Sequence, residues 1–268
     1  MPKFEASAMP PRILICGEPA SGKTGALAQL ANAGYRLMIH DFDQNARVIA
    51  SYLKPGPNEV YISSYASAKQ ADVNFFPGSG GAMDQAASEL QRFGKMLLHW
   101  KVAGGEDLGP CTSWTSKDVV VIDSGTFLGD MLLLAAQKNP QYKPNMMMTK
   151  FGIAGDYYGA VLDRLTGYNM GATVIVLTHV MQTGEKDDQG KIVGKARDIP
   201  VGVGEKFSKK MQTYFSDIWH LEVGRDGKRS FKTAATDKAS LRTSSPNLIK
   251  PVEDFDLASM LDRLTGSK

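Results

Sequence analysis

The chain has 268 residues, 43% hydrophobic and 22% charged, as in a globular domain with a substantial core, and its formal net charge of +3 permits a polyanionic partner without requiring one. Its longest apolar runs, such as Met131–Ala136, are far shorter than the roughly 20 residues that cross a bilayer, which excludes a membrane-spanning protein. Two distant cysteines, Cys16 and Cys111, exclude a disulfide framework and favour a reducing compartment, and no secretory signal opens the chain, so we expect a cytoplasmic protein.

The first half of the chain begins with a loose leader over Met1–Pro11, because Pro10-Pro11 cannot begin a central strand. A short apolar strand, Arg12–Cys16, then leads into a glycine-rich turn. The next expected elements, in chain order, are a helix at Thr24–Ala33, a strand at Tyr35–His40, helices at Ser67–Gln70 and Asp84–Trp100 separated by the loop Phe76–Gly81, a β-branched strand at Asp118–Ile122, and a helix at Phe127–Gln137.

The second half opens with Gln137–Lys150, which we expect to be a mobile excursion. The polar, glycine-rich stretch Gly184–Gly204 predicts a long loop or a hairpin. The other expected elements, in chain order, are a helix at Asp156–Met170, a buried strand at Thr173–Leu177, a hairpin of Ile218–Val223 and Ser230–Ala234, and a helix at Asp256–Leu264. Strands that alternate with helices predict an α/β fold whose mostly parallel sheet is covered on both faces.

The glycine-rich turn contains a complete phosphate-binding motif, Walker A. Glycines let the backbone curl so that its N–H groups point at a phosphate, and the helix that follows adds its positive dipole end. Lys23 brings a charge to the β- and γ-phosphates, and Thr24 offers a hydroxyl to Mg²⁺. The pattern therefore predicts binding of ATP with Mg²⁺ by the residues Gly17, Glu18, Pro19, Ala20, Ser21, Gly22, Lys23, Thr24 and Gly25.

Three polar positions follow predicted strands at the edge of the sheet where ligands bind. Asp123 ends a buried strand and is the expected magnesium residue beside Thr24, although it would also suit the cap of the next helix. Asp41 and Asp43 end the strand after the loop, where either would orient a water for hydrolysis or merely form a solvated turn. His179 would sense the γ-phosphate, or would bond backbone in the core. We read His40, His99 and His220 as structural, because they form no metal-ligand pattern.

Together these motifs resemble a RecA-like P-loop core, and more closely the small RecA-like ATPases of tailed bacteriophages, the Sak-type single-strand annealing recombinases. The likeness rests on the P-loop, on Val119–Ser124 and on Val174–Val180, with Asp198–Lys206 and Phe215–Trp219 also similar. It implies a RecA-like ATPase domain over residues 12–250, with a leader before it and a helical tail over 251–268. It also implies that Asp43 is the catalytic carboxylate, although the family has Glu there, and that Lys23 and His179 act beside it.

The resemblance further implies single-stranded DNA as partner and self-association into a filament or ring. Two loops would bind DNA, one over Gln137–Lys150 and one over Gln182–Lys206, with Tyr142 or Phe151 stacking bases. Residues 183–242 carry 13 Lys and Arg against 9 Asp and Glu, which supports a nucleic-acid partner but also fits a solvated charged loop. The expected phosphate contacts are Lys186, Lys191, Lys195 and Arg197. The cations expected to reach a neighbouring subunit's nucleotide are Lys206, Lys209, Lys210, Lys238 and Arg242.

Other classes of P-loop protein stay open on the sequence alone. A small-molecule kinase or a nucleotide switch acting on a partner would share the same loop, but a kinase lid is usually rich in arginine. The stretch Gly184–Gly204 contains one arginine, Arg197. A ring motor of the helicase type is a third possibility, which the absence of a further domain in 268 residues disfavours.

Overall fold

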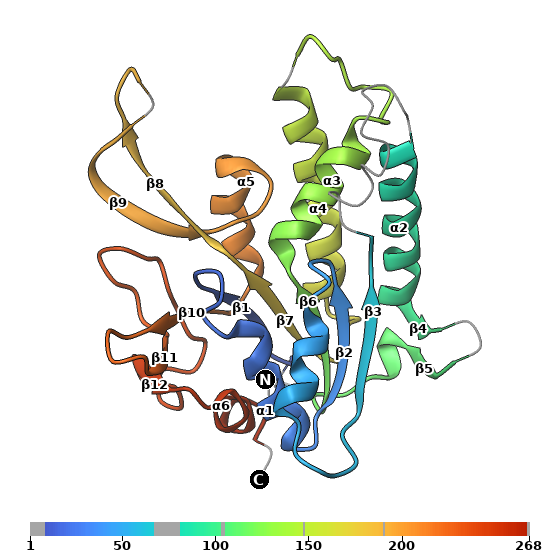
Figure 1. Cartoon of the computed structure of the whole chain (residues 1–268), viewed down its shortest axis with the longest axis vertical. Helices are drawn as coiled ribbons and strands as arrows, with labels where there is room; N and C mark the ends of the chain where they lie inside the picture. Colours follow the sequence, from blue (N-terminus) through green and yellow to red (C-terminus); the bar gives the residue numbers. More distant parts are fainter. Residues whose placement is uncertain (1–8, 67–80, 103–104, 147, 190, 267–268) are drawn as a thin grey trace, which may run out of the picture.

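The computed structural model describes residues 9–66, 81–102, 105–146, 148–189 and 191–266. A twisted eight-stranded sheet runs through the molecule, with helices on both faces (Figure 1). From one edge to the other, its strands are β12 (Val252–Asp254), β11 (Arg229–Lys232), β10 (Asp217–Val223), β1 (Arg12–Cys16), β7 (Thr173–Thr178), β6 (Asp118–Asp123), β2 (Arg36–Asp41) and β3 (Val60–Ser64).

The pairing of these strands confirms the predicted fold class. β10, β1, β7, β6, β2 and β3 all run parallel, whereas β11 pairs antiparallel with β10 to form the C-terminal hairpin, and β12 pairs antiparallel with β11. β7 separates β1, which leads into the P-loop, from β6, which ends at Asp123. The chain is therefore an α/β protein with a mostly parallel central sheet.

Each central strand supplies two hydrophobic cores, because alternate side chains point to opposite faces of the sheet. Leu14 and Val176 pack in the core on one face, and Ile13 and Ile175 pack in the core on the other. Strands covered on both sides need a continuous run of apolar residues, which explains the sequences Arg-Ile-Leu-Ile-Cys in β1 and Val-Val-Val-Ile in β6.

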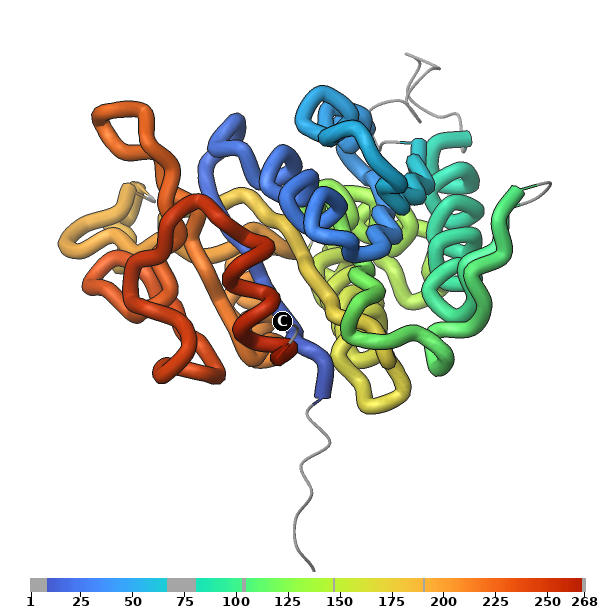
Figure 2. Tube along the Cα trace, turned by 90° about the horizontal axis from the view of Figure 1, so that it is seen from below, coloured from blue at the N-terminus to red at the C-terminus, as the bar shows by residue number. Residues whose placement is uncertain are grey.

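Six α-helices of the described residues form the two covering layers. They are α1 (Lys23–Asn32), α2 (Gly81–Leu98), α3 (Gly125–Ala136), α4 (Met148–Thr166), α5 (Gly204–Met211) and α6 (Leu257–Thr265). Helices α2 to α5 pack in one core, and α1 and α6 pack in the other. Figure 2 shows α6 beside α1, where Gln29 of α1 donates to the Phe255 carbonyl at 2.9 Å and accepts from the Leu257 amide at 2.7 Å.

Several short elements differ from those expected from the sequence. α4 begins at Met148, so the end of the expected excursion Gln137–Lys150 is helical, and α5 was not expected at all. Further unexpected elements are β3, β12, an antiparallel pair of β4 (His99–Lys101) and β5 (Asp107–Pro110), and the 3₁₀ helices η1 (Ala46–Tyr52), η2 (Cys111–Ser113) and η3 (Gln212–Tyr214). The expected helix Ser67–Gln70, residues 76–80 of the expected loop, residues 1–8 of the leader, Met147 and Gly190 lie outside the described residues.

The polar stretch after β7 is a hairpin, which confirms one of the two alternatives. β8 (Val180–Lys186) pairs antiparallel with β9 (Ile192–Pro200), and the pair extends away from the sheet beside α5 (Figure 1). Glu205 of α5 accepts hydrogen bonds from Lys186 at 2.9 Å, from Lys209 at 2.8 Å and from the Thr183 hydroxyl. These donors lower the pKa of Glu205 to about 2, so the carboxylate that joins the hairpin to α5 stays ionised at neutral pH.

None of the helices in the described part of the chain has both the length and the apolar character needed to cross a bilayer.

Replacing Glu205 tests how the hairpin is held. In Glu205→Ala, Lys186, Lys209 and Thr183 lose their shared acceptor, so we expect amide hydrogen exchange in β8 and β9 to become several-fold faster while β1 and β7 stay protected. Glu185→Ala is the matched control, because Glu185 lies on the same hairpin and forms no ion pair among the described residues. Equal exchange in both variants would show that Glu205 does not hold the hairpin.

Candidate functional site

The loop between β1 and α1 is shaped by three backbone features. Gly22 has φ 100° and Ala20 has φ 62°, both in the left-handed region that glycine tolerates best. A Cβ on Gly17 would lie 2.6 Å from the carbonyl oxygen of Leu221 in β10, so only glycine fits between the two strands. The loop is thus a tight curl that packs directly against the sheet.

Lys23 lies buried inside this curl. Its ammonium group donates to the carbonyl oxygens of Gly17 and Glu18, both at 2.9 Å. Burial lowers the pKa of Lys23, and the nearby carboxylate of Asp123 opposes that shift. The cation is therefore placed at the centre of the loop, where a phosphate held by the loop amides would lie.

Asp123 and Thr24 meet at the carboxyl end of the sheet. The Thr24 hydroxyl donates to Asp123 Oδ2 at 2.8 Å, and Asp123 is almost fully buried. Burial, followed by the negative charge of Asp43, raises the pKa of Asp123 to about 7, although the Thr24 hydrogen bond acts in the opposite direction. A divalent cation between the hydroxyl and the carboxylate would stabilise the ionised form of Asp123.

The donor set fits Mg²⁺ better than a protein-bound transition metal. The described residues contain no group of three or more His, Cys, Asp or Glu side chains arranged to hold a metal ion. An ion beside Thr24 and Asp123 would meet one hydroxyl oxygen and one carboxylate. Mg²⁺ commonly binds in this way, through one or two protein oxygens.

The two aspartates that follow β2 lie in different places. Asp41 is buried and accepts from the Ser64 hydroxyl at 3.1 Å and from the Asn45 amide at 3.2 Å. Asp43 instead lines a cavity of about 320 Å³ together with Lys23 and Asp123. Burial and the nearby charge of Asp43 raise the pKa of Asp41. Of the two candidates, Asp43 is the carboxylate that faces the cavity.

His179 also lines this cavity, directly after β7. Its backbone amide donates to the Thr126 hydroxyl at 3.0 Å, and its ring packs edge-on against Phe127, with centroids 5.9 Å apart. Burial, and then the charge of Lys23, lower the pKa of His179, so the imidazole is neutral at pH 7. The His179 carbonyl accepts from the Val201 amide at 2.8 Å, which connects the cavity to the end of β9.

The cavity contains residues that the sequence analysis did not select. Val48 and Tyr52 of η1 form an apolar wall, and the Tyr52 side chain is 58% exposed. Ser124 follows Asp123, and its buried Oγ has no hydrogen-bond partner among the described residues. Arg229 enters from β11, where its Nε donates to the Ser21 carbonyl at 2.8 Å. No local pattern connects Arg229 to a loop 208 residues earlier.

The hairpin cations expected to bind DNA fall into two groups. Lys186 is paired with Glu205 at 2.9 Å, and Lys195 is paired with Asp237 at 3.1 Å. Lys191 and Arg197 are exposed, and among the described residues neither side chain forms an ion pair.

None of the cations expected at a subunit boundary lines the cavity that holds Lys23. Lys206 and Lys210 line a separate cavity of about 530 Å³ beside Phe151, and Lys209 is paired with Glu205. Lys238 is exposed in the segment after β11. Arg242 donates to the Gln212 and Phe215 carbonyls of its own chain, so its guanidinium is held internally in this structure.

Tyr142, the other residue expected to stack DNA bases, packs half-buried against the core.

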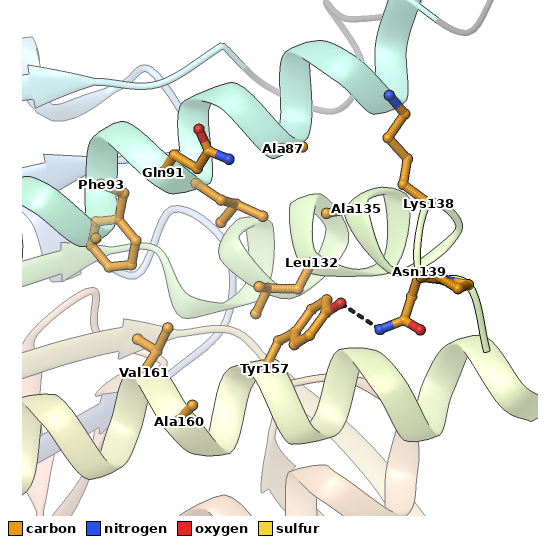
Figure 3. A pocket seen from close by; sticks show the side chains of 13 residues that line it. Ala87, Gln91, Phe93, Leu132, Ala135, Lys138, Asn139, Tyr157, Ala160 and Val161 are labelled. Atoms are coloured by element: carbon orange, nitrogen blue, oxygen red, sulfur yellow. Dashed lines mark hydrogen bonds between the residues drawn. The ribbon is translucent and has the colours of Figure 1, made fainter. Parts of the chain in front are cut away.

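A further cavity, of about 480 Å³, lies between α2, α3 and α4 (Figure 3). Leu132, Tyr157 and Val161 form much of its wall, and Asn139 donates to the Tyr157 hydroxyl at 2.7 Å. Its lining is mostly apolar and includes none of the P-loop residues.

No protein-family model matches the chain, and a search of curated proteins finds no match. Among solved structures, the chain is similar to one described as a prototypical ATPase from the type III secretion system of pathogenic bacteria, with a TM-score of 0.40 and 11% sequence identity. The similarity covers 93% of this chain and 57% of that chain, so this chain spans little more than half of that protein's length.

Gly17→Ala tests the packing of the loop against the sheet. Because the added methyl group would meet the Leu221 carbonyl at 2.6 Å, we expect the free energy of unfolding to fall by about 1–3 kcal/mol. Gly94→Ala, inside α2 with nothing near its Cβ position, should instead gain up to about 1 kcal/mol. Urea unfolding measures both, and equal stability of the two variants would contradict the close approach of β10.

Proposed function

We propose that this chain binds ATP with Mg²⁺, hydrolyses it, and uses the cycle to control binding of single-stranded DNA by the β8–β9 hairpin. The observation that carries the proposal is the single cavity in which the P-loop lysine, the Thr24–Asp123 pair and Asp43 meet. These are the groups that phosphoryl transfer to water requires: a cation for the phosphates, oxygen ligands for magnesium, and a carboxylate for the water.

Phosphate binding follows from the loop and the helix after it. The amides of the curl and the N-terminus of α1 provide donors and partial positive charge for the β-phosphate. Lys23 exchanges its bonds to the Gly17 and Glu18 carbonyls for bonds to the β- and γ-phosphates. Thr24 and Asp123 would hold Mg²⁺, which neutralises charge that develops on the phosphate oxygens.

Hydrolysis requires a water aligned with the γ-phosphorus. Asp43 faces the cavity and would accept a proton from that water as its oxygen bonds to the phosphorus and the bond to the β–γ bridging oxygen breaks. ADP and phosphate leave, and Asp43 returns the proton to solvent. Asp41 is held by Ser64 and Asn45, so it would position the turn that presents Asp43.

The hairpin is attached to the nucleotide cavity at both of its ends. β8 starts at the residue after His179, and the amide of Val201, just after β9, donates to the His179 carbonyl at 2.8 Å. A γ-phosphate that shifts His179 would therefore change the hairpin's position through its backbone. This connection supports a switch in which ATP favours one arrangement of the hairpin.

The choice of DNA rests on charge and on resemblance. Lys191 and Arg197 are exposed cations on the hairpin, and Lys186 and Lys195 lie beside them in surface ion pairs, which are weak enough to exchange for phosphate. The sequence resemblance to Sak-type phage recombinases supports the same partner, together with self-association into a filament or ring. In such an assembly, Lys206, Lys209, Lys210 or Lys238 would be the cations closest to a neighbouring subunit.

The roles of the cavity residues are separable by mutation. Lys23→Ala should abolish ATP binding, because it removes the cation at the centre of the loop. Asp43→Asn should keep ATP affinity but lower kcat by about 10²–10⁴-fold, the usual contribution of a general base. Asp41→Asn is the matched control, with a smaller expected effect on kcat. Phosphate release and nucleotide titration measure these values, and full activity of Asp43→Asn would exclude its role.

The hairpin's partner is tested by binding of labelled single-stranded DNA in the presence of Mg²⁺ and ATP. The double variant Lys191→Ala/Arg197→Ala should bind more weakly, and the slope of log affinity against log salt should fall by about 0.7 for each DNA phosphate that the hairpin no longer neutralises. Lys54→Ala/Lys95→Ala removes two exposed lysines outside the hairpin and should bind like the wild type. Equal weakening in both double variants would indicate a general charge effect rather than a hairpin site.

A further inference from the structure

Arg229 is a charged residue that lines the cavity of the P-loop but comes from the C-terminal part of the chain. It is the first residue of β11, after the turn that follows β10, and its side chain is exposed. Its Nε donates to the Ser21 carbonyl at 2.8 Å, and the residue lines the same cavity as Lys23 and Thr24. The C-terminal hairpin thus brings a second cation to the phosphate-binding loop.

The loop is fitted closely around this side chain. A Cβ on Gly22 would lie 2.7 Å from Arg229 Nε and 3.2 Å from its Cδ. Gly22 therefore serves two purposes: it adopts φ 100°, and it leaves room for the arginine to reach the loop.

Aromatic packing against the guanidinium of Arg229 restricts its position. The Arg229 Cζ lies 5.7 Å from the centroid of the Phe255 ring, and Phe255 stacks on Phe231, with centroids 5.9 Å apart. The Phe255 carbonyl is in turn bonded to Gln29 of α1 at 2.9 Å. Because the planar group is held between a backbone carbonyl and an aromatic ring, it loses less conformational freedom on binding a ligand than a flexible lysine would.

The charge of Arg229 has no carboxylate partner in the part of the chain that the structure describes. Nε is the only one of its side-chain nitrogens with a hydrogen-bond partner there, and the side chain forms no ion pair. The two carboxylates that line the cavity have other hydrogen-bond donors: Asp123 accepts from the Thr24 hydroxyl, and Asp43 accepts from the Asn45 amide. The N–H groups of Nη1 and Nη2 are thus available to an anion beside the loop.

We propose that Arg229 binds the β- and γ-phosphates of the nucleotide, as a cation supplied by the C-terminal hairpin of the same chain. This inference rests on the proposed ATP site and adds a residue that the motif does not contain. Lys23 approaches the phosphates from inside the loop, and Arg229 approaches them over Ser21 and Gly22 on its outer side. Bound nucleotide would therefore also tie β11 to α1, and so join the last part of the fold to the first.

The test compares Arg229→Gln, Arg229→Lys and the control Lys228→Gln by nucleotide titration in the presence of Mg²⁺. Lys228 is the adjacent exposed cation and is paired only loosely with Asp226, at 3.8 Å. We expect Arg229→Gln to weaken ATP and ADP binding by about tenfold or more, the scale of one charge-assisted hydrogen bond. Arg229→Lys should recover part of the affinity, and Lys228→Gln should stay within about twofold of the wild type, as expected for a surface charge.

AMP competition identifies the contacted group. Contact with the β- and γ-phosphates leaves AMP binding unchanged in Arg229→Gln, whereas equal weakening of AMP and ATP would place Arg229 on the nucleoside side and overturn the proposal. ATP affinity of Arg229→Gln within twofold of the wild type would overturn it as well. Thermal unfolding without nucleotide controls for folding of each variant.

The outcomes separate this inference from the proposed function. If the wild type binds ATP, Lys23→Ala does not, and Arg229→Gln binds normally, the ATP site stands and the role of Arg229 fails. If the wild type itself binds no ATP, the proposed function fails first.

Discussion

The hydrogen bond between Thr24 and Asp123, 2.8 Å long, joins the two parts of the chain on which the site depends. Thr24 lies in the first turn of the helix after the P-loop, and Asp123 ends a strand that is separated from β1 by β7. A nearly fully buried carboxylate whose pKa is raised to about 7 is costly to keep ionised, so it needs a partner that favours its charge. A magnesium ion held with a nucleotide, as proposed above, would supply that partner.

The two-layer packing of the sheet explains how the site stays accessible. The sheet is covered by α1 and α6 on one face and by α2 to α5 on the other. The edge where the parallel strands end at their carboxyl termini is not covered by these helices, so polar residues can lie there. Asp43 and His179 follow β2 and β7 at that edge, and Asp123 ends β6, which lies between them. The β8–β9 hairpin leaves from the same edge, directly after His179, so under the proposed function a change at the nucleotide would reach the hairpin through one residue of backbone. The C-terminal strands close the other side of the cavity with Arg229.

Local signals predicted much of this arrangement. The P-loop, the buried strands and the hairpin turn before β11 each depend on a few consecutive residues, so the sequence was enough to find them. β3 was missed because its residues are mostly half-buried and lack a strong apolar run, and α5 was missed because only eight residues, mostly polar, form it around Phe207 and Met211. Whether Asp41 or Asp43 faces the cavity depends on the turn after β2, and Arg229 depends on a contact across 208 residues, which no local pattern encodes.

The most direct test of the account is the rate of phosphate release by the wild-type chain as single-stranded DNA is added, with Mg²⁺ and with a chelator. ATP hydrolysis should require Mg²⁺ and rise with DNA concentration to a plateau, because the cavity and the hairpin are connected at His179. Hydrolysis that requires Mg²⁺ but ignores DNA would contradict the proposed partner and leave the ATP site in place. A chain that neither binds nor hydrolyses ATP in Mg²⁺ would contradict the central claim.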